Sequence, residues 1–132
     1  MSFTKISFHW FEESKKDLKV AEGLFNLKHY SYSLFFCHLS LEKMLKALFV
    51  AKNQEHAPYI HDLVVLAKKA SLQLSKKHVD DMETMTSFNI QGRYSDYKSE
   101  FYKKYNNRLT AQKYLKITKE YLVWLEKQLK VV

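Results

Sequence analysis

Apolar residues recur at three- and four-residue spacing along most of the chain, which is the period of an amphipathic helix. The longest such stretches cover residues 6–27, 31–52 and 108–130, and shorter ones cover residues 62–71 and 75–91. Residues 31–52 are the most apolar. Their stripe consists of Leu34, Leu41, Leu45 and Leu48, and it is widened by Phe35, Phe36 and Phe49. The pattern predicts an all-α fold, an antiparallel up-and-down bundle of four to five helices, with residues 31–52 at its centre.

Helix-breaking residues separate these stretches. Pro58 is the sole proline, and it makes residues 53–60 a predicted loop. Gly92 follows the fourth stretch, where a glycine commonly ends a helix. Residues 93–106 carry five aromatic side chains without a clean period, so we expect a long connection packed onto the bundle. Gly23 lies inside the first stretch and indicates either a close helix approach or fraying near the helix end.

Length and composition narrow the class of protein. The 132 residues predict one domain, residues 1–132, and two isolated glycines cannot build the phosphate-binding loops of nucleotide-binding α/β folds. The single cysteine, Cys37, excludes an intramolecular disulfide and a multi-thiolate zinc site, and its apolar neighbours predict a core position. The longest apolar run, residues 63–67, is too short to cross a bilayer, and the first residues lack the apolar block of a signal peptide. We therefore expect a cytoplasmic protein.

Charge is distributed unevenly along the chain. Lysine and arginine number 22 against 14 acidic residues, a net charge of +8, of which residues 67–132 contribute +7. Such a basic half favours the approach of RNA, DNA or an acidic protein, although solvated lysine-rich helix faces give the same pattern. Only Arg93 and Arg108 are arginines. Because the planar guanidinium binds phosphate in a bidentate way, each arginine is considered individually.

A polar track runs along the central stretch, where His38, Glu42 and Lys46 follow one another at four-residue steps and so share one side of a helix. One interpretation is a pocket wall in which His38 exchanges protons and Lys46 neutralises a phosphate. The other is a stabilising Glu42–Lys46 ladder of one helix turn. His61 and Asp62 precede the third stretch, where Asp62 is a natural helix cap. No constrained metal-binding spacing is present, so we predict neither a metal nor another cofactor.

A second polar group follows Gly92, in the segment Arg93-Tyr94-Ser95-Asp96-Tyr97. The arginine could clamp a phosphate while the tyrosines stack on bases. Alternatively, Arg93 pairs with Asp96 and pins the loop. The residue types do not decide between these two interpretations.

Several of these segments, in this order, resemble the HEPN (higher eukaryotes and prokaryotes nucleotide-binding) domain family. The resemblance covers roughly residues 8–130 and is carried by Trp10, by residues 16–18 with Ala21, by the run from His38 to Ala47, by His61-Asp62-Leu63, and by Arg93-Tyr94 with Asp96. It implies an antiparallel helical bundle that often forms a homodimer. It also implies a small nucleotidyltransferase partner, commonly in a toxin–antitoxin system.

Many members of that family are metal-independent ribonucleases with an arginine followed four to six residues later by a histidine. Neither arginine here is followed by such a histidine. We therefore expect a dimeric module that binds a nucleotide or RNA phosphate through Arg93, with Tyr94 and Asp96 shaping the site. Glu42, Lys46 and His38 would line it, and His61 and Asp62 would serve as pocket or helix-cap residues. The alternatives are an endoribonuclease toxin in which His38 or His61 replaces the missing histidine, and a purely structural adaptor.

Overall fold

The computed structural model describes residues 3–89 and 95–132, and within them it contains helices and no strands. The helices are α1 (Phe3–Asn26), α2 (Tyr30–Asn53), α3 (Leu63–Lys69), α4 (Lys76–Thr86), α5 (Ser95–Tyr105) and α6 (Arg108–Lys130). The prediction of an all-α bundle is confirmed. No helix in this part of the chain combines the length and the apolar character needed to cross a membrane.

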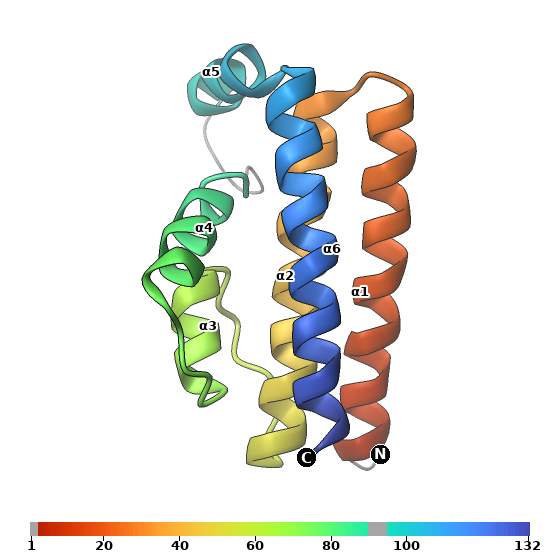
Figure 1. Cartoon of the computed structure of the whole chain (residues 1–132), viewed down its shortest axis with the longest axis vertical. Helices are drawn as coiled ribbons and strands as arrows, with labels where there is room; N and C mark the ends of the chain where they lie inside the picture. Colours follow the sequence, from red (N-terminus) through yellow and green to blue (C-terminus); the bar gives the residue numbers. More distant parts are fainter. Residues whose placement is uncertain (1–2, 90–94) are drawn as a thin grey trace.

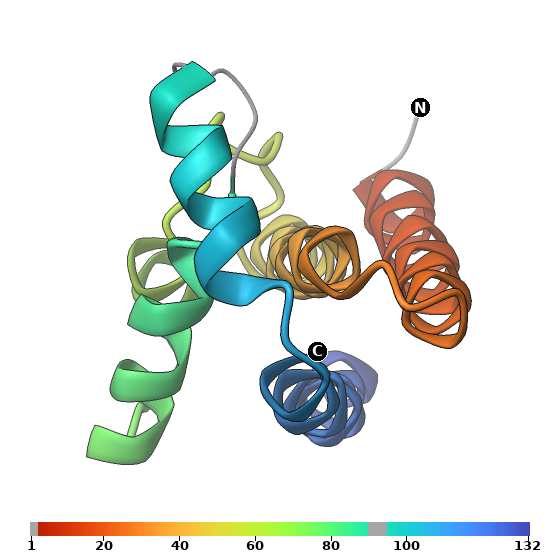
Figure 2. The same cartoon turned by 90° about the horizontal axis from the view of Figure 1, so that it is seen from above.

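The three long helices α1, α2 and α6 lie side by side (Figure 1). Helix α2 runs antiparallel to α1, whereas α6 runs in the same direction as α2 because the intervening helices return the chain to the upper end of the bundle. Helices α3 and α4 cover the side of α2 that faces away from α1, and α5 crosses the upper end (Figure 2). Both chain ends lie together at the lower end (Figure 1).

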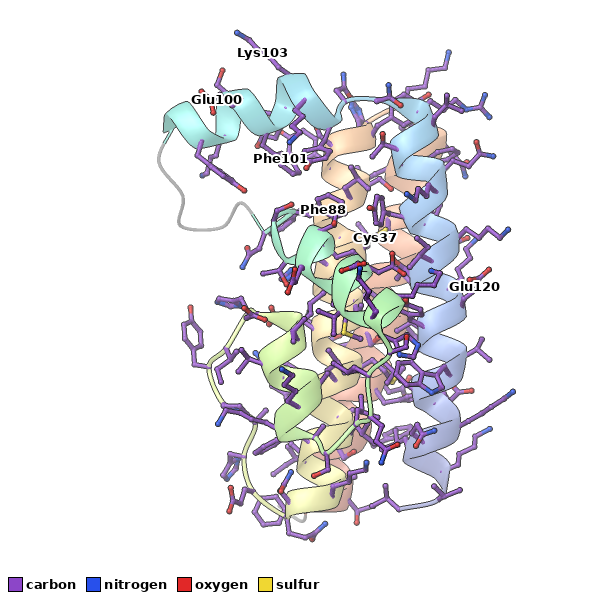
Figure 3. All side chains as sticks on the ribbon, turned by 60° about the vertical axis from the view of Figure 1, so that its left-hand side comes forward. Cys37, Phe88, Glu100, Phe101, Lys103 and Glu120 are labelled. Carbon is purple, nitrogen blue, oxygen red and sulfur yellow. The ribbon has the colours of Figure 1, made fainter. Side chains whose placement is uncertain are left out.

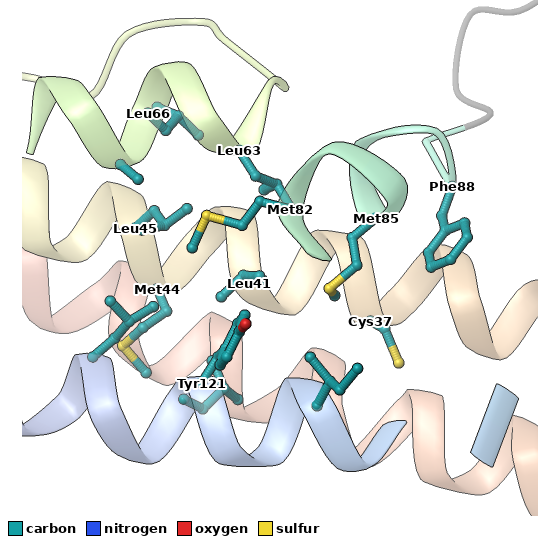
Figure 4. Close-up of a cluster of buried hydrophobic side chains, with 14 of the residues drawn as sticks. Cys37, Leu41, Met44, Leu45, Leu63, Leu66, Met82, Met85, Phe88 and Tyr121 are labelled. Atoms are coloured by element: carbon teal, nitrogen blue, oxygen red, sulfur yellow. The ribbon is translucent and has the colours of Figure 1, made fainter. Parts of the chain in front are cut away.

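Helix α2 is the centre of the core, as its sequence predicts. Fifteen of its 24 residues are buried, and its neighbours on all sides are other helices. Apolar side chains of α2, α3, α4 and α6 meet in one cluster (Figure 4), which includes Leu41, Met44, Leu45, Leu63, Leu66, Met82, Met85 and Tyr121. Cys37 lies in this cluster as a buried free thiol, which confirms its predicted core position.

Serine side chains join α1 to α2. Ser14 Oγ donates to the Ser40 carbonyl at 2.7 Å, and Ser40 Oγ donates back to the Ser14 carbonyl at 2.8 Å. Ser33 and Ser7 donate in the same way to backbone carbonyls of the opposite helix. Each hydroxyl is buried and hydrogen-bonded, so these small polar residues bring the two backbones close without leaving an unpaired group.

The segment 95–105 differs from the sequence prediction, because it forms helix α5 and not an irregular connection. Tyr97, Phe101 and Tyr105 follow one another at four-residue spacing, which places them on one face of a helix. Phe101 is buried and its ring contacts that of Phe88, while Glu100 and Lys103 point away from the bundle (Figure 3). Tyr97, Phe101 and Tyr105 therefore form the inward-facing stripe of a short amphipathic helix, with Phe101 buried and the two tyrosines partly buried.

Two smaller expectations also need correction. Helix α4 ends at Thr86, five residues before the predicted end, and the predicted role of Gly92 lies outside the described residues. Gly23 is exposed within α1, and a Cβ atom built on it would meet nothing within 4 Å. A close helix approach is therefore not the reason for this glycine.

Candidate functional site

The polar track of α2 is buried. The side chains of His38, Glu42 and Lys46 are 0%, 5% and 6% exposed, respectively. Their four-residue spacing places them on one side of α2, and the segment before α3 covers that side. The residues that the sequence places together are thus together in the structure, but as part of the interior.

Glu42 is the centre of this network. Its Oε2 accepts a hydrogen bond from Lys46 Nζ at 2.9 Å, and its Oε1 accepts one from His61 Nδ1, also at 2.9 Å. A buried carboxylate is tolerated only when it is paired and hydrogen-bonded, and both oxygens of Glu42 meet this requirement. The Glu42–Lys46 contact is the one-turn ladder that the sequence allows, and His61 adds a partner from a different segment.

His38 orients the segment that carries His61. Its Nε2 lies 2.9 Å from the His61 carbonyl oxygen, and a carbonyl only accepts, so Nε2 carries the proton and donates. Burial lowers the pKa of His38 below its usual value, which keeps the ring neutral. The other ring nitrogen, Nδ1, is buried and has no hydrogen-bond partner among the residues that the structure describes. His38 therefore positions His61 and does not itself face solvent.

His61 is the member of the network that reaches the surface. Its ring is 34% exposed, and its edge contact with the Tyr59 ring has a centroid separation of 4.9 Å. Because Nδ1 donates to Glu42, the ring presents Nε2 as its remaining nitrogen, for which the described residues supply no hydrogen bond. A carboxylate that holds an imidazole in one tautomer and orientation is a common arrangement for proton transfer. The geometry therefore makes His61 the chemically available group.

Asp62 acts as the cap of α3. Its carboxylate accepts from the Val65 backbone N–H at 3.1 Å, as expected of an N-cap residue. The next backbone N–H, that of Leu63, donates to Thr86 Oγ1 at 3.1 Å and ties the start of α3 to the end of α4. Capping accounts for Asp62, and Thr86 is a structural contact that the sequence pattern does not indicate.

The chain matches one known protein family over most of its length. The family model of the HEPN domain matches residues 8–128. The chain belongs to the HEPN domain family. This membership and the all-α bundle identify it as a helical module related to nucleotide or RNA function.

A solved structure supports the same fold. The HEPN chain superimposes on the crystal structure of TT1696 from Thermus thermophilus with a TM-score of 0.78 and 21% sequence identity. The match covers 92% of this chain and 96% of that one, so the likeness extends over the whole bundle. No curated protein matches this chain significantly.

The remaining predicted residues of this HEPN domain form the second polar group. Arg93 and Tyr94 lie outside the described residues, as does the side chain of Asp96, whose backbone belongs to α5. The structure therefore brings together His38, Glu42, Lys46 and His61, with Asp62 adjacent to them. The roles given to Arg93, Tyr94 and Asp96 stay predictions.

Two contacts with α1 complete the surroundings of the polar track. Lys46 Nζ lies 5.3 Å from the centroid of the Trp10 ring, which gives the buried ammonium a second favourable neighbour. Lys43 Nζ lies 2.8 Å from Asp17 Oδ2, and burial raises the pKa of Asp17. Neither contact follows from the helical spacing of α2, although Trp10 belongs to the residues that carry the family resemblance. Within residues 3–89 and 95–132, no three His, Cys, Asp or Glu side chains are placed to hold a metal.

Proposed function

We propose that this HEPN domain binds the phosphate of a nucleotide or RNA, forms a homodimer, and acts with a small nucleotidyltransferase in a toxin–antitoxin-like pair. The family match over residues 8–128 carries this proposal. Arg93 is the proposed phosphate contact, with Tyr94 and Asp96 beside it. His61 is the proposed polar contact from the Glu42 network, because it is the member that reaches solvent.

The distribution of charge supports an anionic ligand. The outer face of α6 carries exposed lysines, namely Lys113, Lys116, Lys119, Lys127 and Lys130. Most of the net charge of +8 lies in the half of the chain that contains this face. Such a surface raises the rate at which a polyanion arrives, and the specific contact must then come from a fixed group such as Arg93.

Binding of a fluorescein-labelled single-stranded oligoribonucleotide, followed by anisotropy, tests the ligand. We expect the affinity to fall at least about tenfold between 50 and 200 mM salt, since contacts with several phosphates release counterions. Arg93→Ala should weaken binding by about tenfold or more, which corresponds to one charged hydrogen-bonded contact. Lys19→Ala, which removes an exposed cation from α1, is the charge-matched control and should change the affinity less than twofold. An affinity that does not change with salt concentration, or equal losses of affinity in Arg93→Ala and Lys19→Ala, would contradict the proposal.

Two measurements test the partners. Co-expression with a small nucleotidyltransferase encoded beside this chain should give a complex that survives size-exclusion chromatography, and the absence of such a neighbouring gene would remove the partner claim. Light scattering on the purified chain should give a mass near twice its 15.8 kDa. A monomeric mass across the micromolar range would remove the dimer claim.

A ribonuclease is the second candidate, and the Glu42–His61 hydrogen bond is the observation that favours it. In that reaction His61 Nε2 accepts the proton of a ribose 2′-hydroxyl, and the 2′-oxygen attacks the adjacent phosphorus. The 5′-oxygen then leaves with a proton from solvent, and a 2′,3′-cyclic phosphate remains. His38 is fully buried and bound to a backbone carbonyl, so of the two candidate histidines only His61 is accessible.

RNA cleavage in the presence of EDTA separates the two candidates. If His61 is the base, His61→Ala should reduce the cleavage rate by about 10²-fold or more. His9→Ala, which changes an exposed histidine on α1, is the control and should leave the rate unchanged. A wild-type rate no higher than that of Arg93→Ala and His61→Ala would eliminate the ribonuclease and leave the binding module.

A further inference from the structure

A hollow of about 340 Å³ lies between the turn from α1 to α2 and the start of α6. These parts of the chain meet at the upper end of the bundle (Figure 1). It is lined by Phe25, Asn26, Lys28, Tyr30 and Arg108. Its size is at the lower end of the range of pockets that hold small ligands. Of its lining residues, Lys28 and Arg108 are cationic and exposed, and none is acidic.

The guanidinium of Arg108 lies over an aromatic ring. Its central carbon lies 5.8 Å from the centroid of the Phe25 ring, and that ring packs edge to face against Tyr30 at 5.5 Å. A guanidinium placed over a ring keeps its in-plane N–H groups free, and these are the groups that bind phosphate in a bidentate way. The contact with Phe25 therefore leaves the N–H donors of Arg108 unused.

The described residues place no carboxylate in an ion pair with either cation of the hollow. Some lysines elsewhere are paired, for example Lys43 with Asp17 and Lys46 with Glu42. In the part of the chain that the structure describes, neither Lys28 nor Arg108 forms an ion pair with a carboxylate. The first turns of α2 and α6, which begin beside them, also contain no acidic residue. An anion in the hollow would therefore replace no internal partner.

The backbone fixes Lys28 in an unusual conformation. Its φ of 66° is left-handed, a position that glycine normally takes at the end of a helix. Two hydrogen bonds close the turn, from the Lys28 N–H to the Phe25 carbonyl at 2.9 Å and from the His29 N–H to the Leu24 carbonyl at 2.8 Å. This is the Schellman arrangement with a lysine in the glycine position, so the turn holds a cation where the backbone alone would favour glycine.

We propose that this hollow is a second phosphate site, which takes the phosphate of a nucleotide or of an RNA strand. Arg108 supplies the bidentate contact, Lys28 supplies a point charge, and Tyr30 gives the attached sugar or base an apolar wall. The proposed site is defined without Arg93, and none of the Glu42 network lines the hollow. It depends on the proposed function only in the choice of a nucleotide phosphate as the ligand.

Amide chemical shifts of the ¹⁵N-labelled chain test the site, with inorganic phosphate, AMP and a short single-stranded oligoribonucleotide as probes. We expect AMP or the oligonucleotide to shift the amides of residues 25–30 and 107–110, and inorganic phosphate to bind at least about tenfold more weakly. The tighter of the two nucleotide probes identifies the source of the phosphate. No shift at these residues with any probe, or equal affinity for all three, would overturn the proposal.

Variants separate this site from its surroundings. Arg108→Ala should weaken the binding that these amides report by about tenfold. Arg108→Lys should weaken it severalfold, because lysine keeps the charge but lacks the paired N–H donors of the guanidinium. Lys28→Gly should also weaken it while the fold is kept, since glycine suits the left-handed turn. Lys104→Ala, which removes an exposed cation of α5, is the control and should change the affinity less than twofold. Equal losses of affinity in Arg108→Ala and Lys104→Ala would mean that binding depends only on net charge, which would overturn the proposed site.

The same experiment keeps the two proposals apart. Arg93→Ala should leave the shifts of residues 25–30 unchanged if the second site exists. If only Arg93→Ala abolishes nucleotide binding, the second site is wrong and the proposed function stands. If only Arg108→Ala does so, the second site stands and the assignment of Arg93 fails.

Discussion

Removal of the Glu42 carboxylate is the sharpest test of the buried network. Glu42→Leu leaves the Lys46 ammonium 6% exposed, with the Trp10 ring as its remaining favourable contact. Removing one partner of a buried ion pair typically costs about 3–5 kcal/mol, because the other charge stays unpaired in the interior. For a domain of this size, that corresponds to a fall in Tm of roughly 10–20 °C.

A double-mutant cycle assigns this loss to the pair. The double variant Glu42→Leu/Lys46→Met has no buried charge at these two positions, and its methionine side chain can pack against Trp10. We therefore expect the double variant to be more stable than Glu42→Leu alone, with a coupling energy of about 2 kcal/mol or more. His61 loses its hydrogen-bond partner in both variants, but its ring is partly exposed and can bind water.

Urea unfolding, followed by circular dichroism and tryptophan fluorescence, measures these free energies. Lys15→Met is the matched control, because the Lys15–Glu126 pair is 3.5 Å long and its side chains are 44% and 27% exposed, so its loss should cost no more than about 1 kcal/mol. A cost for Glu42→Leu similar to that of the control would refute the reasoning. So would additive effects of Glu42→Leu and Lys46→Met, because they would mean that the 2.9 Å contact does not stabilise the fold.

Three further outcomes follow from the structure. Burial lowers the pKa of His38, so the unfolded chain takes up a proton that the folded chain does not. Stability should therefore fall as the pH drops below about 6.5, by up to about 1.4 kcal/mol per pH unit, and His38→Gln should flatten that part of the urea-midpoint profile. Gly23→Ala should raise the free energy of unfolding by up to about 1 kcal/mol, since the added methyl meets open space, and a lower urea midpoint would contradict this. Burial raises the pKa of Cys37 to about 12, so a thiol reagent at pH 8 should label it only as fast as the chain opens, and rapid labelling of the folded protein would disprove its burial.

The long helices could be predicted from the sequence because their burial pattern is simple. Helix α2 contacts helices on several sides and is apolar along most of its length, and α1 and α6 each bury one stripe against it. The spacing of apolar residues repeats over five or more turns in each of these helices, so one irregular position does not obscure the helical period. The predicted bounds of these three helices agree with the structure to within three residues at each end.

Helix α5 was missed because its periodicity is short and its buried residues are aromatic. Eleven residues give only three turns, and Tyr102 beside Phe101 blurs the four-residue spacing of the stripe. An isolated helix of this length is marginal in water, so its formation depends on packing. The contacts of Phe101 and Tyr105 with Phe88 supply that packing, and they join residues of two separate segments.

The polar track shows a different limit of sequence analysis. Four-residue spacing places His38, Glu42 and Lys46 on one side of α2, and the structure agrees. Their burial could not be predicted, because the groups that cover them come from distant segments. His61 approaches from the chain before α3, and Trp10 approaches from α1. A helical pattern identifies a shared face but not the element that packs on it.

The pairing of Lys46 with Glu42 has a consequence for phosphate binding. The Lys46 ammonium is nearly inaccessible and already neutralised, so a phosphate could reach it only if the buried pair were broken. Breaking that pair would leave the Glu42 carboxylate without a partner of opposite charge, which is unfavourable in the interior. Any tight phosphate contact must therefore come from cations that the fold leaves free. Arg93 on the one hand and Arg108 with Lys28 on the other are separate candidates, and Arg93→Ala and Arg108→Ala distinguish them.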